Sequence, residues 1–155
     1  MAETLGSLMD KLSIKSIREF YLKKMIRLKN NNFSAEQLQE KLRVLQVQKK
    51  NLVREIDFFF AAVARGELVI RDEKLKLYNN PRLMNRIGAI DTLARGFDAL
   101  TKKNLELWQL EDEARRADVP LSFIGSIKRK IDAANQQRND LIDRIDELLE
   151  RSLRK

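Results

Sequence analysis

Hydrophobic positions along the chain recur at helical spacing in four long segments, and this pattern predicts four helices. The first should span about residues 5–28, with apolar residues on more than one face. The second should begin after a capping box made by Ser34 and Gln37 and end at Gly66. The third should occupy about residues 82–116 and the fourth about residues 121–153, so the predicted fold class is all-α.

The connection between the second and third helices, at about residues 67–80, breaks the helical pattern. Leu68–Ile70 and then Leu75 and Leu77 flank a charged turn. Short apolar runs around a polar turn predict a short β-hairpin or an irregular connection.

The chain also contains an internal repeat. At an offset of 88 residues the first helix matches the third, and Asp10 meets Asp98; one inserted residue later, Lys49 meets Arg138. Because polar residues match as well as leucines, duplication is favoured over a chance alignment of amphipathic helices. The repeat predicts two antiparallel helical hairpins, about 4–65 and 82–153, related by a pseudo-twofold axis. With the connection at 66–81, they should form one four-helix bundle domain over residues 1–155.

Folding each hairpin about its turn predicts two equivalent polar ties, Asp10 with Lys49 and Asp98 with Arg138. A charge inside an apolar seam is costly unless it is paired, so such ties would fix the register of the helices. The alternative is a polar pocket that binds an anion or a sugar. Structural ties are the favoured interpretation, because a functional pocket normally gathers more polar groups.

Composition limits the chemistry that the chain can perform. It contains neither cysteine nor histidine, which excludes thiolate chemistry and iron–sulfur clusters and removes the usual neutral-pH base. Asp143, Glu147 and Glu150 share a helix face and could hold magnesium, but a solvated acidic face is the favoured interpretation. We therefore expect no enzymatic activity, no metal and no cofactor.

The net charge of +8 suggests a second class of function. Basic residues gather on the first helix, and such a face can attract nucleic acid or another polyanion. A solvated surface without a partner is the alternative, and no nucleic-acid motif accompanies the charge. The candidate polyanion face comprises Lys11, Lys15, Arg18, Lys23, Lys24 and Arg27.

Aromatic residues suggest a contact surface. Phe58, Phe59 and Phe60 are consecutive and cannot all face one partner helix, so at least one should meet the other hairpin, the connection or another subunit. With Ile14 and Tyr21 they form the candidate interaction surface, and a homodimer or a larger assembly is expected. Trp108 should be a core or interface anchor, with ligand stacking as the alternative.

Three segments of the chain are distinctive: Leu-Trp-x-Leu-Glu-Asp at 107–112, Asn-Gln-x-Arg-Asn-Asp-Leu-Ile at 135–142, and Thr4–Ile17. These segments resemble a family of small helical bacterial proteins of unknown function. The chain departs from the family pattern at Gln109, where the pattern has histidine. The resemblance implies an all-helical bacterial protein, supplies no activity, and suggests an accessory role in surface-glycan synthesis.

Together these features predict a scaffold, adaptor or assembly subunit that acts through protein–protein contacts. A basic module that binds nucleic acid or another polyanion is the alternative, and a glycan-synthesis accessory is a further one. The N-terminus lacks the basic segment, apolar core and cleavage site of a signal peptide, so none is expected. The longest apolar run, 58–64, is too short to span a bilayer. The expected location is the cytoplasm, without a membrane span.

Overall fold

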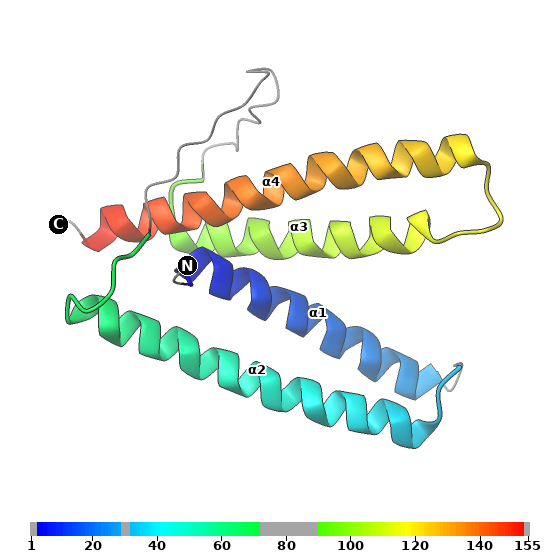
Figure 1. Ribbon diagram of the computed structural model, residues 1–155, viewed down its shortest axis with the longest axis horizontal. Coiled ribbons are helices and arrows are strands. Elements are labelled where there is room, and N and C mark those ends of the chain that lie inside the picture. Colours follow the sequence, from blue (N-terminus) through cyan, green and yellow to red (C-terminus); the bar gives the residue numbers. More distant parts are fainter. Residues whose placement is uncertain (1–2, 29–31, 72–89, 154–155) are drawn as a thin grey trace.

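A computed structural model describes residues 3–28, 32–71 and 90–153, and these form four α-helices (Figure 1). They are α1 (Leu5–Leu28), α2 (Ala35–Ala64), α3 (Leu93–Ala114) and α4 (Leu121–Leu153). The predicted all-α fold class is therefore confirmed. The predicted connection shows no strand over the described residues 67–71, and residues 72–80 lie outside the described part of the chain.

The predicted limits of the second helix are confirmed by its end structures. The Ser34 hydroxyl accepts a hydrogen bond from the Gln37 backbone N–H at 3.2 Å, and the Ser34 backbone N–H donates to the Gln37 side chain at 3.0 Å. Past the other end, Gly66 has a φ of 73°, in the left-handed region where glycine carries no steric penalty. The capping box at Ser34 and the glycine at position 66 therefore mark the two ends of α2.

The third helix begins later than predicted. Residues 90–92 are not helical, and the Thr92 side chain caps α3 by accepting from the Arg95 backbone N–H at 3.3 Å. Threonine in an extended conformation is a helix-capping residue, so it separates α3 from the preceding residues. The start predicted at Arg82 is wrong for residues 90–92, and residues 82–89 lie outside the described part.

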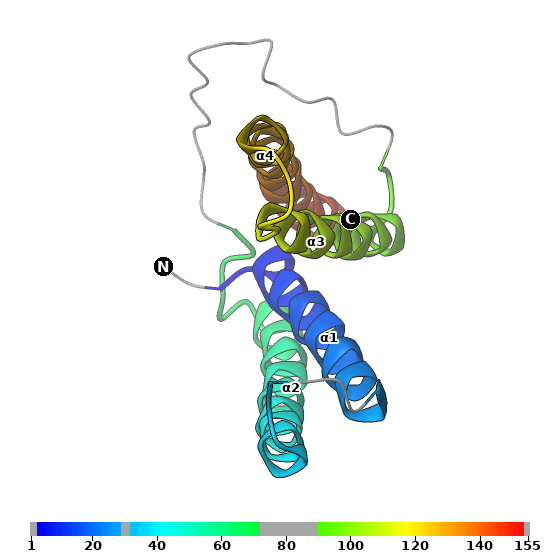
Figure 2. The ribbon, with the colours of Figure 1, turned by 90° about the vertical axis from the view of Figure 1, so that its right-hand side faces the viewer.

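The four helices pack as two hairpins, α1 with α2 and α3 with α4, into a bundle. α1 is the central helix, because it also packs against both α3 and α4. Over the described residues, the backbone of α2 approaches α1 and neither of the other two helices, so α2 lies on the outside (Figure 2). A pseudo-twofold axis would exchange α1 with α3 and α2 with α4, so the contact between α1 and α4 would require an equivalent contact between α3 and α2. That contact does not occur among the described residues, so the predicted pseudo-symmetry does not extend to the packing.

Two apolar clusters explain why the hairpins meet at one end and diverge at the other (Figure 1). The larger cluster joins both hairpins at the N-terminal half of α1, whereas the smaller one lies within the α3–α4 hairpin. The buried residues of the larger cluster are Leu5, Leu8, Leu52, Phe59, Leu100, Leu141, Ile145 and Leu149. Those of the smaller cluster are Leu107, Ile127, Ile131 and Ala134.

The start of α1 lies directly against α4. The Gly6 backbone N–H donates a 2.7 Å hydrogen bond to Oδ1 of Asp146, whose side chain is fully buried. A Cβ atom at Gly6 would overlap the backbone carbonyl oxygen of Ile142, so the two helices can approach this closely only because residue 6 is glycine. The Asp146 carboxylate satisfies one of the unpaired N–H groups at the positive end of the α1 dipole.

None of the helices in the described part of the chain combines the length and the hydrophobicity that crossing a membrane requires.

Candidate functional site

The structure corrects the predicted polar ties. The Asp10 carboxylate accepts two hydrogen bonds from the Arg138 guanidinium of α4, from Nε to Oδ1 at 2.9 Å and from Nη2 to Oδ2 at 2.7 Å. Lys49 instead lies 2.8 Å from Glu19. The pairing predicted within the first hairpin is therefore wrong, because α1 turns its Asp10 face toward α3 and α4.

The second predicted tie is also wrong. Asp98 is exposed and pairs with Lys102, one helical turn away, at 2.7 Å. The repeat places Asp98 and Asp10 at matching positions, but Asp10 lies on the face of α1 that packs against the other hairpin and is buried there, whereas Asp98 is exposed. The real tie joins the hairpins to each other.

Asp10 lies in a buried polar network contributed by three helices. Asn104 of α3 donates from Nδ2 to Oδ1 of Asp10 at 2.8 Å and to Oγ of Ser13 at 2.6 Å. The Ser13 hydroxyl in turn donates to the Asp10 backbone carbonyl at 2.9 Å. Asp10, Ser13 and Asn104 are all buried, so this network holds α1, α3 and α4 in one register.

Glu19 forms a second charged cluster between α1 and α2. Hydrogen bonds from Lys23 at 2.6 Å and Lys49 at 2.8 Å lower the pKa of Glu19 from 4.5 to about 2. A carboxyl group whose pKa is lower in the folded state stabilises the fold above its unfolded pKa and loses that effect as the pH falls. Both lysines keep solvent exposure, which limits the contribution to the free energy of unfolding to about 1 kcal/mol.

We therefore expect Glu19→Gln to lower the free energy of unfolding by about 1 kcal/mol at neutral pH. Because the charged form provides the stability, the difference from the wild type should shrink between about pH 5 and pH 2. Urea unfolding followed by circular dichroism across that range measures it. A difference that did not change with pH would contradict the assignment.

The aromatic triplet divides between the core and the surface. Phe59 is buried with 4% exposure in the larger cluster, which joins both hairpins, so it is a core residue and is not exposed to another subunit. It continues the seam of Leu38, Leu45 and Leu52, at seven-residue spacing, which faces α1. Phe58 and Phe60 remain exposed, at 64% and 42%.

The other two members of the candidate interaction surface lie beside a cleft between the hairpins. Ile14 is half-buried and lines it. The Tyr21 ring stacks on Trp108 of α3, with ring centroids 5.2 Å apart and planes 15° from parallel. Trp108 is thus a contact between the hairpins, as expected for an anchor, and it also borders the cleft.

The outer face of α2 carries a second stripe that the sequence analysis missed. It consists of Val44, Val47, Asn51, Arg54 and Phe58, at alternating steps of three and four residues. All are exposed, the two valines at 41% and 50%, and the stripe lies on the side of α2 away from its buried seam. Its spacing was visible in the sequence, but only the packing of α2 on a single helix shows that the stripe is uncovered.

The candidate polyanion face divides into three parts. Lys11 and Lys23 form ion pairs with Glu3 and Glu19, and Lys15 donates a hydrogen bond to Gln48 at 2.9 Å. Within the described residues, no ion pair engages Lys24, Arg27 or Arg18. All three are exposed; Arg18 also borders the cleft, and Arg27 lines a separate cavity between α1 and α2.

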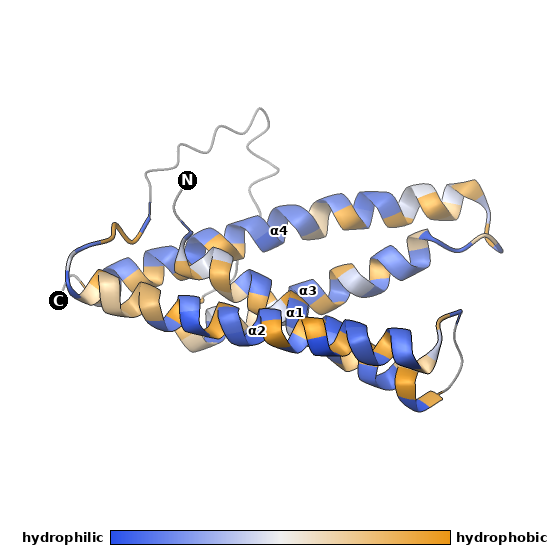
Figure 3. Ribbon diagram, turned by 60° about the horizontal axis from the view of Figure 1, so that its bottom comes forward, coloured by the Kyte–Doolittle hydropathy of each residue, from blue (hydrophilic) through white to orange (hydrophobic). Residues whose placement is uncertain are grey.

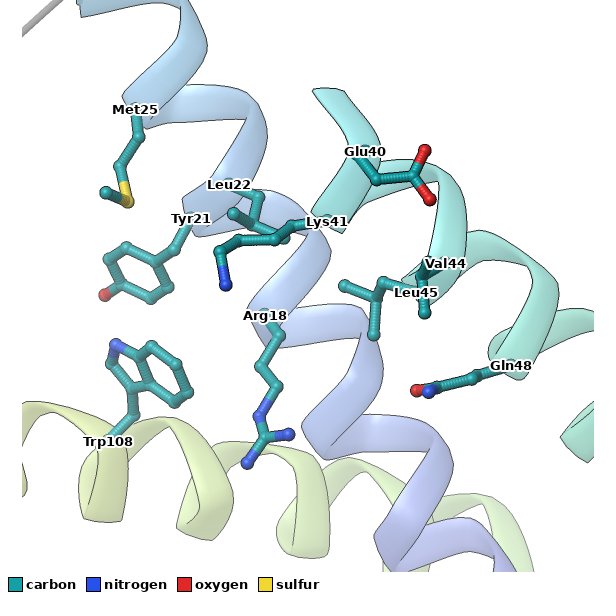
Figure 4. Close-up of a pocket in the computed structure, with 10 residues that line it drawn as sticks. All are labelled: Arg18, Tyr21, Leu22, Met25, Glu40, Lys41, Val44, Leu45, Gln48 and Trp108. Carbon is teal, nitrogen blue, oxygen red and sulfur yellow. The ribbon is translucent and has the colours of Figure 1, made fainter. Parts of the chain in front are cut away.

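The cleft lies where the hairpins diverge, and it has two adjoining cavities that share Arg18 and Trp108. The larger, about 560 Å³, has mostly apolar walls from α1 and α2. Figure 4 shows Trp108 reaching from α3 toward Tyr21 of α1, with Arg18 beside them. The smaller, about 350 Å³, is lined by polar groups of α3 and α4, including Asn104, Arg115 and Arg138.

The acidic face of α4 is neutralised by arginines. Arg71 lies 2.9 Å from Glu150 and 3.8 Å from Glu147, and Arg144 lies 3.0 Å from Glu147. Across the described ranges, no group of acidic side chains is arranged to hold a metal ion. Glu147 and Glu150 therefore form ion pairs on the surface of α4.

A family model described as a protein of unknown function (DUF4254) matches residues 1–71 and 97–155, which is most of the chain. The chain belongs to this family. No curated protein and no solved structure matches it. In this DUF4254 protein, the three segments named in the sequence analysis meet at the smaller cavity, through Ile14, Trp108, Asn135 and Arg138.

Proposed function

We propose that this DUF4254 protein is a non-enzymatic assembly module that associates with a second copy of itself through the outer stripe of α2. The observation that carries the proposal is the packing of α2, whose backbone approaches only α1 among the described helices and whose opposite face exposes Val44, Val47 and Phe58. Heptad spacing of exposed apolar residues is the pattern by which helices pair.

The stripe is suited to pairing with itself. Its centre is Asn51, and Val44 and Phe58 lie seven residues to either side. In an antiparallel pair centred on Asn51, Val44 of each copy meets Phe58 of the other, which is the self-complementarity that a twofold interface requires. A polar asparagine at the centre disfavours shifted registers, as it does in coiled coils.

Sedimentation velocity of Phe58→Glu tests the proposal. Because Phe58 is 64% exposed, the substitution should leave the fold intact and place a charge in the interface, raising the dimer dissociation constant at least tenfold. The matched control is Gln46→Glu, which adds the same charge at an exposed position of α2 outside the stripe.

A wild type that dimerises, with Phe58→Glu monomeric and Gln46→Glu unchanged, supports self-association through α2. Equal dimerisation by all three proteins would show that the dimer interface lies outside the stripe of α2. A monomeric wild type that carries nucleic acid removable by moderate salt would instead favour the polyanion function through Lys24 and Arg27.

A further inference from the structure

We propose that the cleft between the hairpins binds a phosphate monoester carried on an apolar body, with the phosphate in the smaller cavity and the body in the larger. This site is separate from the α2 stripe, since Val44 alone is common to both. Arg18 and Trp108 line both cavities, so a ligand that lies across these two residues would reach both.

The smaller cavity has the groups that bind phosphate. Three guanidinium groups line it, from Arg18 of α1, Arg115 of α3 and Arg138 of α4, together with the Asn135 amide and one carboxylate, that of Glu111. The Asn104 amide nitrogen also faces this region but already donates to Asp10 and Ser13. Guanidinium groups match the geometry of phosphate oxygens better than ammonium groups do, and they keep their charge at every physiological pH.

The three arginines differ in how far neighbouring carboxylates already neutralise their charge. Arg138 is held by the buried Asp10, which fixes its position. Arg115 interacts with Asp112 at 3.2 Å and with Glu111 at 3.7 Å. Arg18 has no ion pair among the described residues, so it has the positive charge most available to a ligand.

The larger cavity suits an apolar or aromatic body. Most of its wall is apolar, from Leu22, Met25 and Leu45 together with the stacked rings of Tyr21 and Trp108 (Figure 4). The polar part of the lining comes from Arg18, Glu40, Lys41 and Gln48. A volume of about 560 Å³ falls in the range of ligand pockets, which are typically apolar with a few polar groups that set orientation. The pairing of an apolar cavity with a cationic one therefore selects an amphiphilic anion.

Trp108 is the only tryptophan of the chain, so its fluorescence reports directly on this cleft. The full-length protein is titrated separately with adenosine monophosphate, dodecyl phosphate below its micelle concentration, and inorganic phosphate. The first two carry aromatic and aliphatic bodies, and the third has none. We expect a saturable change with one of the amphiphilic probes at concentrations at which inorganic phosphate gives none.

Two variants of α1 test the role of the cation. Arg18→Gln should weaken binding of the effective probe at least tenfold, because it removes a positive charge that lines both cavities and that no described residue neutralises. Lys24→Gln removes an equal charge from an exposed position of the same helix outside both cavities, and should change binding less than twofold.

The aromatic and aliphatic probes identify the body by which of them binds more tightly, and preference for either supports the site. Absence of a saturable change with both amphiphilic probes would overturn the proposal. So would equal binding of inorganic phosphate, or equal weakening by Arg18→Gln and Lys24→Gln, because each would reduce the effect to nonspecific charge.

Discussion

Asp10→Ala is expected to lower the free energy of unfolding by about 2–4 kcal/mol. The substitution leaves the Arg138 guanidinium without its carboxylate and removes an acceptor from the buried Asn104 amide. The Arg138 side chain keeps 29% exposure, so water offsets part of the loss and the effect falls below that of a fully buried pair. Urea unfolding at neutral pH measures it.

The repeat offers a matched control at the equivalent position. Asp98→Ala removes the same side chain where it is 65% exposed, and should change stability by less than about 0.5 kcal/mol. A double-mutant cycle should couple Asp10 with Arg138 and show no coupling of Asp10 with Lys49. Coupling to Lys49 in place of Arg138 would contradict the packing of α1 against α4.

Gly6→Ala is expected to destabilise the protein by about 2–3 kcal/mol, although alanine favours helix. The added Cβ would overlap the Ile142 carbonyl oxygen, so α1 must move away from α4. That movement lengthens the hydrogen bond from the Gly6 N–H to the buried Asp146 carboxylate. Thermal and urea unfolding followed by circular dichroism measure the loss.

Gly125→Ala is the control for helix propensity. A Cβ at Gly125 of α4 meets no atom within 4 Å, so the same substitution should raise stability by about 0.5–1 kcal/mol. Opposite signs at the two glycines would confirm the close approach of α1 and α4. A stabilising effect at both would show that the N-terminus of α1 does not lie against α4.

Much of the fold follows from local sequence signals. The capping box at Ser34, the glycine at 66 and the hydrophobic periodicity predict α2 nearly to its ends, because these features act within one helix. The start of α3 was predicted too early because helical spacing of apolar residues continues before Thr92 in the sequence. In the structure Thr92 caps α3, and residues 90–92 are not helical. Local helix propensity does not determine which helices pack against each other, so the contacts of α1 with all three other helices could not be predicted.

The candidate site was only partly predictable, for the same reason. Arg138 was identified as a charge inside an apolar seam, which is a local pattern, and Asp10 through the repeat. Their partners depend on how the hairpins meet, and a repeat suggests symmetry that the packing does not have. The cleft was not predicted, since Arg18, Trp108 and Arg138 lie far apart in the sequence and come together only through the contacts of α1.

The central functional claim is that the exposed stripe of α2 joins two copies of the chain. Light scattering of the purified wild type, at low and at high salt, tests this claim most directly. Since apolar contacts are insensitive to salt, we predict twice the chain mass of 18.2 kDa under both conditions. A mass of one chain under both conditions would contradict it.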